Sequence, residues 1–244
     1  MKRHTPRRFA LFVIALLLAG LPIRSALADD VLSTYWPDTI SRWSDLIIQF
    51  SNNNGLDPNL VAAVIEEESK GDPRRVSPAG AVGLMQIMSY EAGFSWRPKA
   101  SRLKIPEVNL EWGTNTLGEV IRQAQGRLSL ALLAYNSGWD RIRLKATRTF
   151  AAKVLDHYAR SIISDEGLDP NALHNYNLYI VARSSARPMF VDRVSSAGQF
   201  EALRNFDPAT LTADMPHAVA YATIDERHVG WWVEVYIETA DLKR

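Results

Sequence analysis

The amino-acid sequence predicts a mainly α-helical domain followed by a small α+β module. Apolar residues recur with the three-and-four spacing of amphipathic helices from about residue 38 to residue 163. After the polar run 164–167 the pattern changes to short apolar segments, and within 229–238 the apolar residues occupy alternate positions. Apolar content is 47% and charged content 23%, values typical of a packed globular protein.

The first 28 residues have the layout of a secretory signal peptide. A basic start is followed by the apolar run 9–21, and Ala26-Leu27-Ala28 supplies an A-x-A cleavage site. This apolar run is shorter than the roughly 20 residues that a membrane span requires. We therefore expect an exported protein, periplasmic or extracellular, with no stable membrane span after signal cleavage. An uncleaved N-terminal anchor is the alternative.

Charge and composition exclude several classes of function. The 28 basic and 27 acidic residues give a net charge of +1, but residues 1–28 hold five basic residues and no acidic one. The remaining chain is mildly acidic, which predicts no nucleic-acid partner. The absence of Cys excludes disulfides, thiolate metal sites and a Cys nucleophile. The few His residues form no helical H-x-x-x-H pair, so we expect no metal and no cofactor.

Helix signals mark the first elements of the domain. A helix is predicted over 38–52, with Asp38 as its cap. A second helix is predicted to start at Asp57-Pro58, with Asp57 as the N-cap and Pro58 in the first helical position, and to end near Ser69.

The middle of the chain is also predicted to be helical. The apolar segment 80–88 predicts a short helix, and a polar, Pro-containing stretch follows it to about Pro106. Three further helices are predicted, over 109–125, 128–135 and 148–163.

The C-terminal part favours strands. They are predicted at 178–182, 189–191, 219–224 and 229–237, with a short helix over 198–205. We expect a signal peptide (1–28), a helical domain (29–163) and a small accessory module of unknown role (164–244). The alternative is that the last segment extends the first core.

Aromatic residues in the last predicted strand suggest a role for this module. Trp231, Trp232 and Tyr236 allow a sugar-stacking face or a docking face for an envelope protein partner. Ordinary core packing is the other interpretation.

A carboxylate occupies an unusual position in the helix at 58–69. At 100° per residue, Glu68 falls about 20° from Val61, within the apolar stripe, while Glu66 and Glu67 point away from it. Burial disfavours the ionised form and raises the pKa of a carboxyl group. A protonated carboxyl in apolar surroundings is what a general acid requires, so Glu68 is the candidate catalytic residue.

Polar groups elsewhere in the chain suit a sugar ligand. Small residues in 76–83 permit a close backbone approach. Gln86 offers an amide among apolar residues, and Tyr135-Asn136 place a phenol and an amide at the end of an apolar segment. Ordinary packing and helix capping are the alternatives for these residues.

The ordered motifs resemble those of the soluble lytic transglycosylase (SLT) domain family. They are Glu68-Ser69, VSPAGAVGLMQIM at 76–88, Asn109-Leu110, Ala134-Tyr135-Asn136-Ser137-Gly138 and Thr147-Arg148. The similarity covers roughly residues 55–160. The sequence departs from the family's common residues at Ser89, Ala146 and Phe150, where Pro, Glu and Tyr are frequent.

The resemblance implies a lysozyme-like helical fold that binds peptidoglycan glycan strands. It matches Glu68 to the family's acid/base, and it matches a further set to residues lining the glycan site: Ser69, Met85, Gln86, Tyr135 and Asn136. It implies cleavage of the β-1,4 bond between N-acetylmuramic acid and N-acetylglucosamine, with a 1,6-anhydromuramoyl product. A hydrolytic lysozyme-type muramidase and a non-catalytic wall-binding module are the alternatives.

Overall fold

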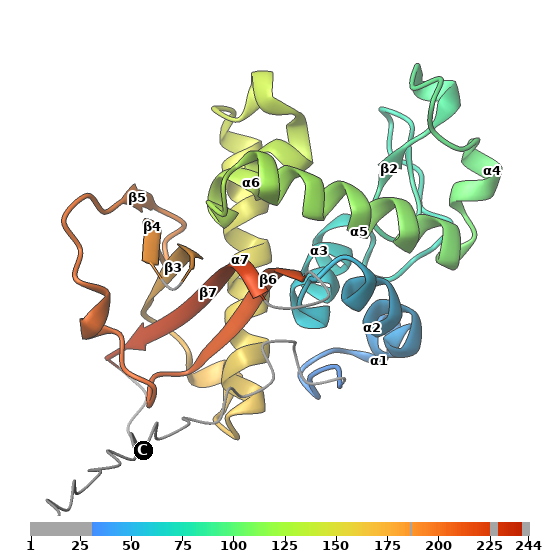
Figure 1. The fold of residues 1–244 in the computed structure, drawn as a ribbon. Coiled ribbons are helices and arrows are strands. Elements are labelled where there is room, and N and C mark those ends of the chain that lie inside the picture. The colour runs from blue at the N-terminus through green and yellow to red at the C-terminus, as the bar shows by residue number, and fades with distance from the viewer. Residues whose placement is uncertain (1–30, 186, 225–228, 241–244) are drawn as a thin grey trace, which may run out of the picture.

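The structure is a computed structural model that describes residues 31–185, 187–224 and 229–240. The predicted signal peptide lies outside these residues. Figure 1 shows a group of helices beside an antiparallel sheet, with the long helix α7 (Lys145–Asp165) crossing behind part of the sheet in this view.

Seven α-helices form the first part of the described chain. They are α1 (Asp38–Ser41), α2 (Ser44–Asn53), α3 (Pro58–Ser69), α4 (Ala100–Leu103), α5 (Pro106–Gln123), α6 (Leu128–Ser137) and α7 (Lys145–Asp165). Short 3₁₀ helices occur at Tyr90–Ala92, Trp139–Arg141, Pro170–Ala172 and Pro208–Thr210. The predicted helices at 58–69, 109–125, 128–135 and 148–163 are confirmed, with ends shifted by up to three residues.

The prediction of one helix over 38–52 is wrong, because the chain breaks it at 42–43. The N-cap is Pro37 rather than Asp38, which lies in the first turn. At the break, Arg42 and the Trp43 indole both donate hydrogen bonds to the carbonyl of Gly71, at 2.8 and 3.1 Å. These contacts tie the first helices to the end of α3.

The predicted helix at 80–88 is a small hairpin instead. Strands β1 (Ala81–Val82) and β2 (Ile87–Met88) pair antiparallel. Gly83 and Gln86 have φ angles of +85° and +49°, which a right-handed helix does not allow. The apolar composition of this segment therefore reflects burial in a turn.

A five-stranded antiparallel sheet follows α7. It is formed by β3 (Tyr176–Ser184), β4 (Arg187–Ser195), β5 (Phe200–Ala202), β6 (His217–Ile224) and β7 (Val229–Thr239) in the order β5-β4-β3-β7-β6. The last two strands, which the sequence predicts at 219–224 and 229–237, pair with each other antiparallel. The predicted helix at 198–205 is wrong, since this segment turns at Gly198 and residues 200–202 pair with β4.

One hydrophobic core joins the helices to the sheet. The buried residues of α3, α5, α6 and α7 form a single cluster with Leu178, Ile180, Val233, Val235 and Ile237. The opposite face of the sheet carries Val181, Val191 and Tyr236, which pack against side chains from residues 203–215. This shared core favours the alternative that residues 164–244 extend the core of the helical domain.

Backbone hydrogen bonds also connect the start of α3 to strand β6. The N–H of Asp57 donates to the carbonyl of Ala220 at 3.1 Å, and the N–H of Ala222 donates to the carbonyl of Gly55 at 2.8 Å. The carboxylate of Asp57 accepts from the buried Tyr158 hydroxyl of α7 at 2.6 Å. Asp57 thus contacts a helix, a strand and the beginning of its own helix.

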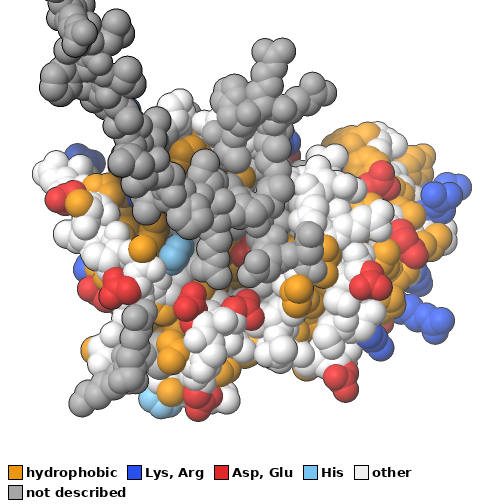
Figure 2. All heavy atoms as spheres, turned by 60° about the horizontal axis from the view of Figure 1, so that its bottom comes forward, with side chains coloured by type: hydrophobic (Ala, Val, Ile, Leu, Met, Phe, Trp, Pro, Cys, Tyr) orange, Lys and Arg blue, Asp and Glu red, His pale blue; other side chains and the backbone are white. Residues whose placement is uncertain are grey.

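Charged side chains of the described residues are mixed on the face drawn in Figure 2. Acidic groups are spread across this face, whereas Lys and Arg gather mainly at one edge. No helix in the described part of the chain is long and apolar enough to cross a membrane.

We expect Gly126→Ala to destabilise the protein because this glycine lies where α5 meets the sheet. Its φ is +82°, and an added Cβ would lie 2.6 Å from Ala182 Cβ and 2.7 Å from the Trp231 ring. Gly167→Ala is the matched control, since Gly167 has a φ of +73° but no neighbouring atom within 4 Å.

In urea unfolding, the control should lose about 1 kcal/mol from backbone strain. Gly126→Ala should lose a further 1–3 kcal/mol, roughly, from overpacking. Equal losses in the two variants would contradict the close packing of α5 on the sheet.

Candidate functional site

The beginning of α3 sets the direction of every side chain on that helix. Asp57 accepts a hydrogen bond from the N–H of Asn59 at 2.8 Å, and Pro58 takes the first helical position, as the sequence predicts. Residues Pro58–Ile65 are all buried. The helix ends at Ser69, where Lys70 adopts a left-handed conformation.

Two of the three consecutive glutamates on α3 have cationic partners. Glu66 pairs with Lys70 at 2.9 Å. Glu67 accepts a hydrogen bond from His157 Nε2 at 3.2 Å, and Lys70 and Lys153 lie within 3.4 Å of its carboxylate. The hydrogen bond from His157, with help from the two lysines, lowers the pKa of Glu67 to about 2. Glu67 is therefore a stable carboxylate held against α7.

Glu68 is in a different environment. Burial raises the pKa of Glu68 from its ordinary value of 4.5 to about 8, although the Arg75 cation opposes this shift. The negative charge of Glu67 raises it further. Within the described chain, the Glu68 carboxyl forms no hydrogen bond or ion pair with another side chain. Glu68 is therefore protonated near neutral pH and has a proton to donate.

The hairpin β1–β2 is fixed by one buried amide. Asn109, on α5, donates from Nδ2 to the carbonyls of Val82 (2.7 Å) and Leu103 (2.9 Å). Its Oδ1 accepts from the N–H of Met85 at 2.7 Å. The sequence motif includes Asn109, but this positioning role was not predicted, because its partners lie up to 27 residues away.

Tyr135 connects the hairpin to the neighbourhood of Glu68. Its hydroxyl donates to the carbonyl of Met85 at 2.9 Å. Burial and the charge of Glu68 raise the pKa of Tyr135 well above 10, so the phenol keeps its proton. Glu68 and Tyr135, both predicted site residues, are therefore close in space, although 67 positions separate them in the sequence.

The other predicted site residues take different environments. Met85 is fully buried. Gln86 donates from Nε2 to the carbonyls of Gly83 (3.0 Å) and Arg75 (3.2 Å). The buried Ser69 hydroxyl donates to Ile65 and accepts from Gly71, so it fixes the end of α3. Asn136 is exposed at the C-terminal end of α6. Their contact with a glycan remains a prediction.

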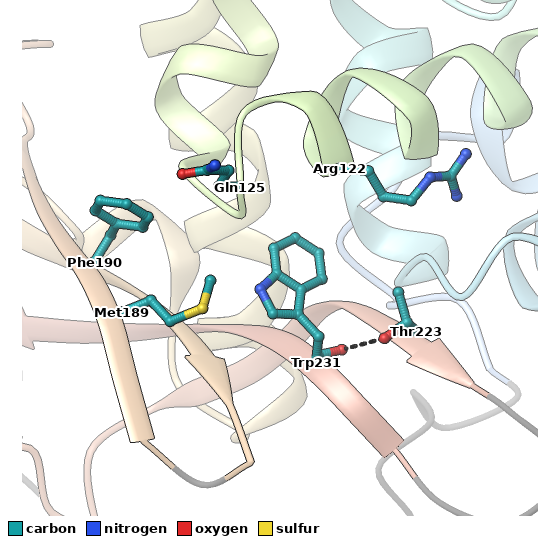
Figure 3. A pocket seen from close by; sticks show the side chains of 6 residues that line it. All are labelled: Arg122, Gln125, Met189, Phe190, Thr223 and Trp231. Atoms are coloured by element: carbon teal, nitrogen blue, oxygen red, sulfur yellow. Dashed lines mark hydrogen bonds between the residues drawn. The ribbon is translucent and has the colours of Figure 1, made fainter.

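A separate cavity lies between the end of α5 and the sheet. It has a volume of about 490 Å³ and is lined by Arg122, Gln125, Met189, Phe190, Thr223 and Trp231. Figure 3 shows the Trp231 indole between Met189 and Arg122. Trp231 lies on the helix-facing side of β7, whereas Tyr236 packs on the opposite side. These two aromatic residues therefore do not form one face.

The described residues contain no group of three or more His, Asp or Glu side chains that could hold a metal ion.

Glu68→Gln should change the pH dependence of stability. Between pH 4.5 and about 8 the folded protein keeps a proton on Glu68 that the unfolded chain releases, so wild-type stability falls as the pH rises through this range. The amide cannot ionise. We expect the stability of the variant relative to wild type to rise by on the order of 2–4 kcal/mol between pH 4 and pH 9.

Urea unfolding at a series of pH values measures this difference. Glu111→Gln, which removes an exposed carboxylate from α5, is the control. Parallel stability profiles for wild type and Glu68→Gln would contradict the raised pKa.

Part of the chain is similar to proteins of a known family. Residues 45–156 match the transglycosylase SLT domain family. A transglycosylase of Enterobacteria phage PRD1 is 36% identical over 115 residues, which cover 47% of this chain and 42% of the relative. The endo-type membrane-bound lytic murein transglycosylase A of Cronobacter sakazakii is 41% identical over 81 residues, which cover 30% of this chain and 40% of the relative.

A solved complex of the 70-kDa soluble lytic transglycosylase with bulgecin A gives a weaker similarity. Its TM-score is 0.46 at 24% identity, over 54% of this chain and 26% of that chain. The chain spans about two fifths of the length of the curated relatives it matches. Its residues 45–156, which include Glu68, the hairpin and Tyr135, match the model of the transglycosylase SLT domain family.

Proposed function

We propose that the protein is a peptidoglycan lytic transglycosylase that cleaves the β-1,4 bond between N-acetylmuramic acid and N-acetylglucosamine. The observation that carries this proposal is the protonated carboxyl of Glu68, which lies near Tyr135 and has no ion-pair partner among the described residues. The printed names of the relatives, which include lytic murein transglycosylases, support the choice of substrate. Membership of the SLT family supports a lysozyme-like fold for the helical region.

Glu68 acts first as an acid. Its carboxyl donates a proton to the glycosidic oxygen, the bond from this oxygen to the anomeric carbon breaks, and N-acetylglucosamine leaves with a hydroxyl group. The neighbouring N-acetyl group of the muramoyl unit stabilises the positive charge on the anomeric carbon. The raised pKa of Glu68 keeps the acid form available at neutral pH.

Glu68 then acts as a base. The ionised carboxylate takes the proton from the 6-hydroxyl of the same muramoyl unit while that oxygen bonds to the anomeric carbon. The product is a 1,6-anhydromuramoyl end, no water is consumed, and Glu68 regains its proton. Most glycosidases use a second carboxylate, but substrate-assisted enzymes do not need one.

The partners of the neighbouring glutamates favour a mechanism with one carboxyl group. Glu66 pairs with Lys70, and Glu67 is held by His157 and Lys153. Moving Glu67 to the substrate would break these interactions and leave the positive charges of Lys70 and Lys153 without the carboxylate between them. Glu67 instead raises the pKa of Glu68 through its fixed charge.

Tyr135, Met85, Gln86, Asn136 and Ser69 are proposed to form or support the glycan site. Tyr135 and Gln86 hold the hairpin through backbone carbonyls, and Asn136 is free to meet a sugar from the end of α6. We also propose export to the periplasm or the extracellular space, which the sequence of residues 1–28 supports and where peptidoglycan is found.

Replacing Glu68 should abolish cleavage while leaving the fold intact. We expect wild-type residues 29–244 to release anhydro-terminated fragments from purified peptidoglycan, and Glu68→Gln to lose at least about 100-fold in rate. Mass spectrometry of the soluble products makes the measurement, and Glu111→Gln serves as the exposed-carboxylate control.

Other products would change the proposal in defined ways. Reducing ends, which are heavier by one water, would indicate a hydrolytic muramidase. Fragments released by Glu68→Gln at the wild-type rate would exclude Glu68 as the acid. Binding of peptidoglycan without cleavage would favour a wall-binding module.

The cleavage rate should fall at alkaline pH. Glu68 must be protonated to act as the acid, so the rate should decrease about tenfold per pH unit once the pH exceeds about 8. Initial rates between pH 5 and pH 10 test this dependence. A falling limb centred near pH 4.5 would contradict it, because it would indicate a Glu68 carboxyl that is already ionised at neutral pH.

A further inference from the structure

We propose that Arg97 binds a carboxylate of the peptidoglycan strand, so that the site selects anionic glycan over uncharged glycan. The inference rests on the proposed function, because it assigns the charge of the substrate near Glu68. Arg97 lies in the segment between the hairpin and α4, outside the motifs that predicted the site.

No acceptor among the described residues pairs with the guanidinium of Arg97. Its Nε is buried and has no hydrogen-bond partner, and the group forms no ion pair within the described chain. Most buried donors in folded proteins have an acceptor, because an unmatched donor costs free energy. An acceptor supplied by a ligand would remove this cost.

Other partly buried arginines of the protein do have acceptors. Arg127 pairs with Asp192, Arg160 with Asp156, and Arg183 with Glu234. Arg97 thus differs from other arginines whose side chains are buried to a similar degree, because those arginines have acceptors for their N–H groups.

Two aromatic rings hold Arg97 in place. Its guanidinium carbon lies 6.0 Å from the ring centre of Phe94 and 5.7 Å from that of Trp112, on α5. Aromatic rings attract a cation without using its N–H donors. The planar group is therefore positioned before a ligand arrives, which reduces the entropy lost on binding.

Arg97 is also close to the proposed site. Its charge interacts with Tyr135, whose phenol in turn interacts with Glu68. The cation whose charge lowers the pKa of Glu68 is Arg75, which opposes the effect of burial. A group bound to Arg97 would therefore be near the proposed site.

A carboxylate is the acceptor that this geometry fits best. Guanidinium groups bind carboxylates through two parallel hydrogen bonds. The hydroxyl and N-acetyl groups of the glycan are uncharged. Its carboxylates come from two sources: the lactyl group of a muramoyl unit without a stem peptide, and the stem peptide itself.

Binding measurements in the Glu68→Gln protein test the assignment without cleavage. The ligands are soluble strands with stem peptides and strands stripped by an amidase, each before and after conversion of the carboxylates to methylamides. Adding Arg97→Gln should weaken binding of the untreated strands by roughly 10–100-fold. Arg97→Lys should retain part of the affinity, because it keeps the charge and loses the second hydrogen bond.

The amidated ligands make the test independent of how the variant folds. Amidation should weaken binding to the protein that retains Arg97 by a similar factor, and it should remove the difference in affinity between that protein and its Arg97→Gln variant. Arg102→Gln, which removes an exposed cation from α4, should leave the affinity for every ligand unchanged.

The outcomes separate the possible sources and the two proposals. A loss confined to strands with stems assigns the peptide carboxylate, and a loss confined to stripped strands assigns the lactyl carboxylate. Equal affinity for charged and amidated strands, or equal weakening of both by Arg97→Gln, would overturn the inference. Carboxylate-dependent binding without anhydro products from the wild type would overturn the proposed function and keep the inference.

Discussion

The buried carboxylate of Asp57 fixes the relation between the three main parts of the structure. It caps α3, accepts from Tyr158 of α7, and sits on a backbone that donates to β6. Because a helix advances about 100° per residue, the point at which α3 begins determines which of its side chains face the core. A shift of one residue would turn Glu68 away from its apolar surroundings.

The three glutamates of α3 show how environment alone separates chemically identical groups. Glu67 meets His157 and two lysines, and its pKa falls to about 2. Glu68, the next residue, is desolvated without a paired cation, and its pKa rises to about 8. The fixed charge of Glu67 contributes to the shift of Glu68. The ion pairs around Glu67 thus support both the packing of α3 on α7 and the proton of the proposed acid.

Features coded by neighbouring residues could be predicted from the sequence. Asp57-Pro58 identifies the start of α3, and the helical period places Glu68 on the apolar side. Features coded by distant contacts could not be predicted. The segment 80–88 has helical composition, but Asn109 holds it as a hairpin from α5. The break at 42–43 depends on Gly71 in the same way.

The environment of Arg97 also could not be predicted from a sequence pattern. Phe94 is close in the chain, but Trp112 comes from α5, and the missing acceptor is visible only after every neighbour has been placed. Conversely, the predicted site set includes Ser69, whose hydroxyl is engaged by its own helix end. A motif identifies which residues belong together without separating those that hold the backbone from those that meet a ligand.

The hydrogen bonds between residues 55–57 and β6 have a consequence for self-association. Strand β6 lies at the edge of the sheet, and an exposed edge offers free N–H and C=O groups to strands of other molecules. Here the N–H of Ala222 donates to the carbonyl of Gly55, and the carbonyl of Ala220 accepts from the N–H of Asp57. The chain before α3 therefore covers the middle of that edge. Local opening of this segment would uncover the edge and release the cap of α3 at once. Resistance to aggregation and the orientation of Glu68 therefore depend on the same few residues.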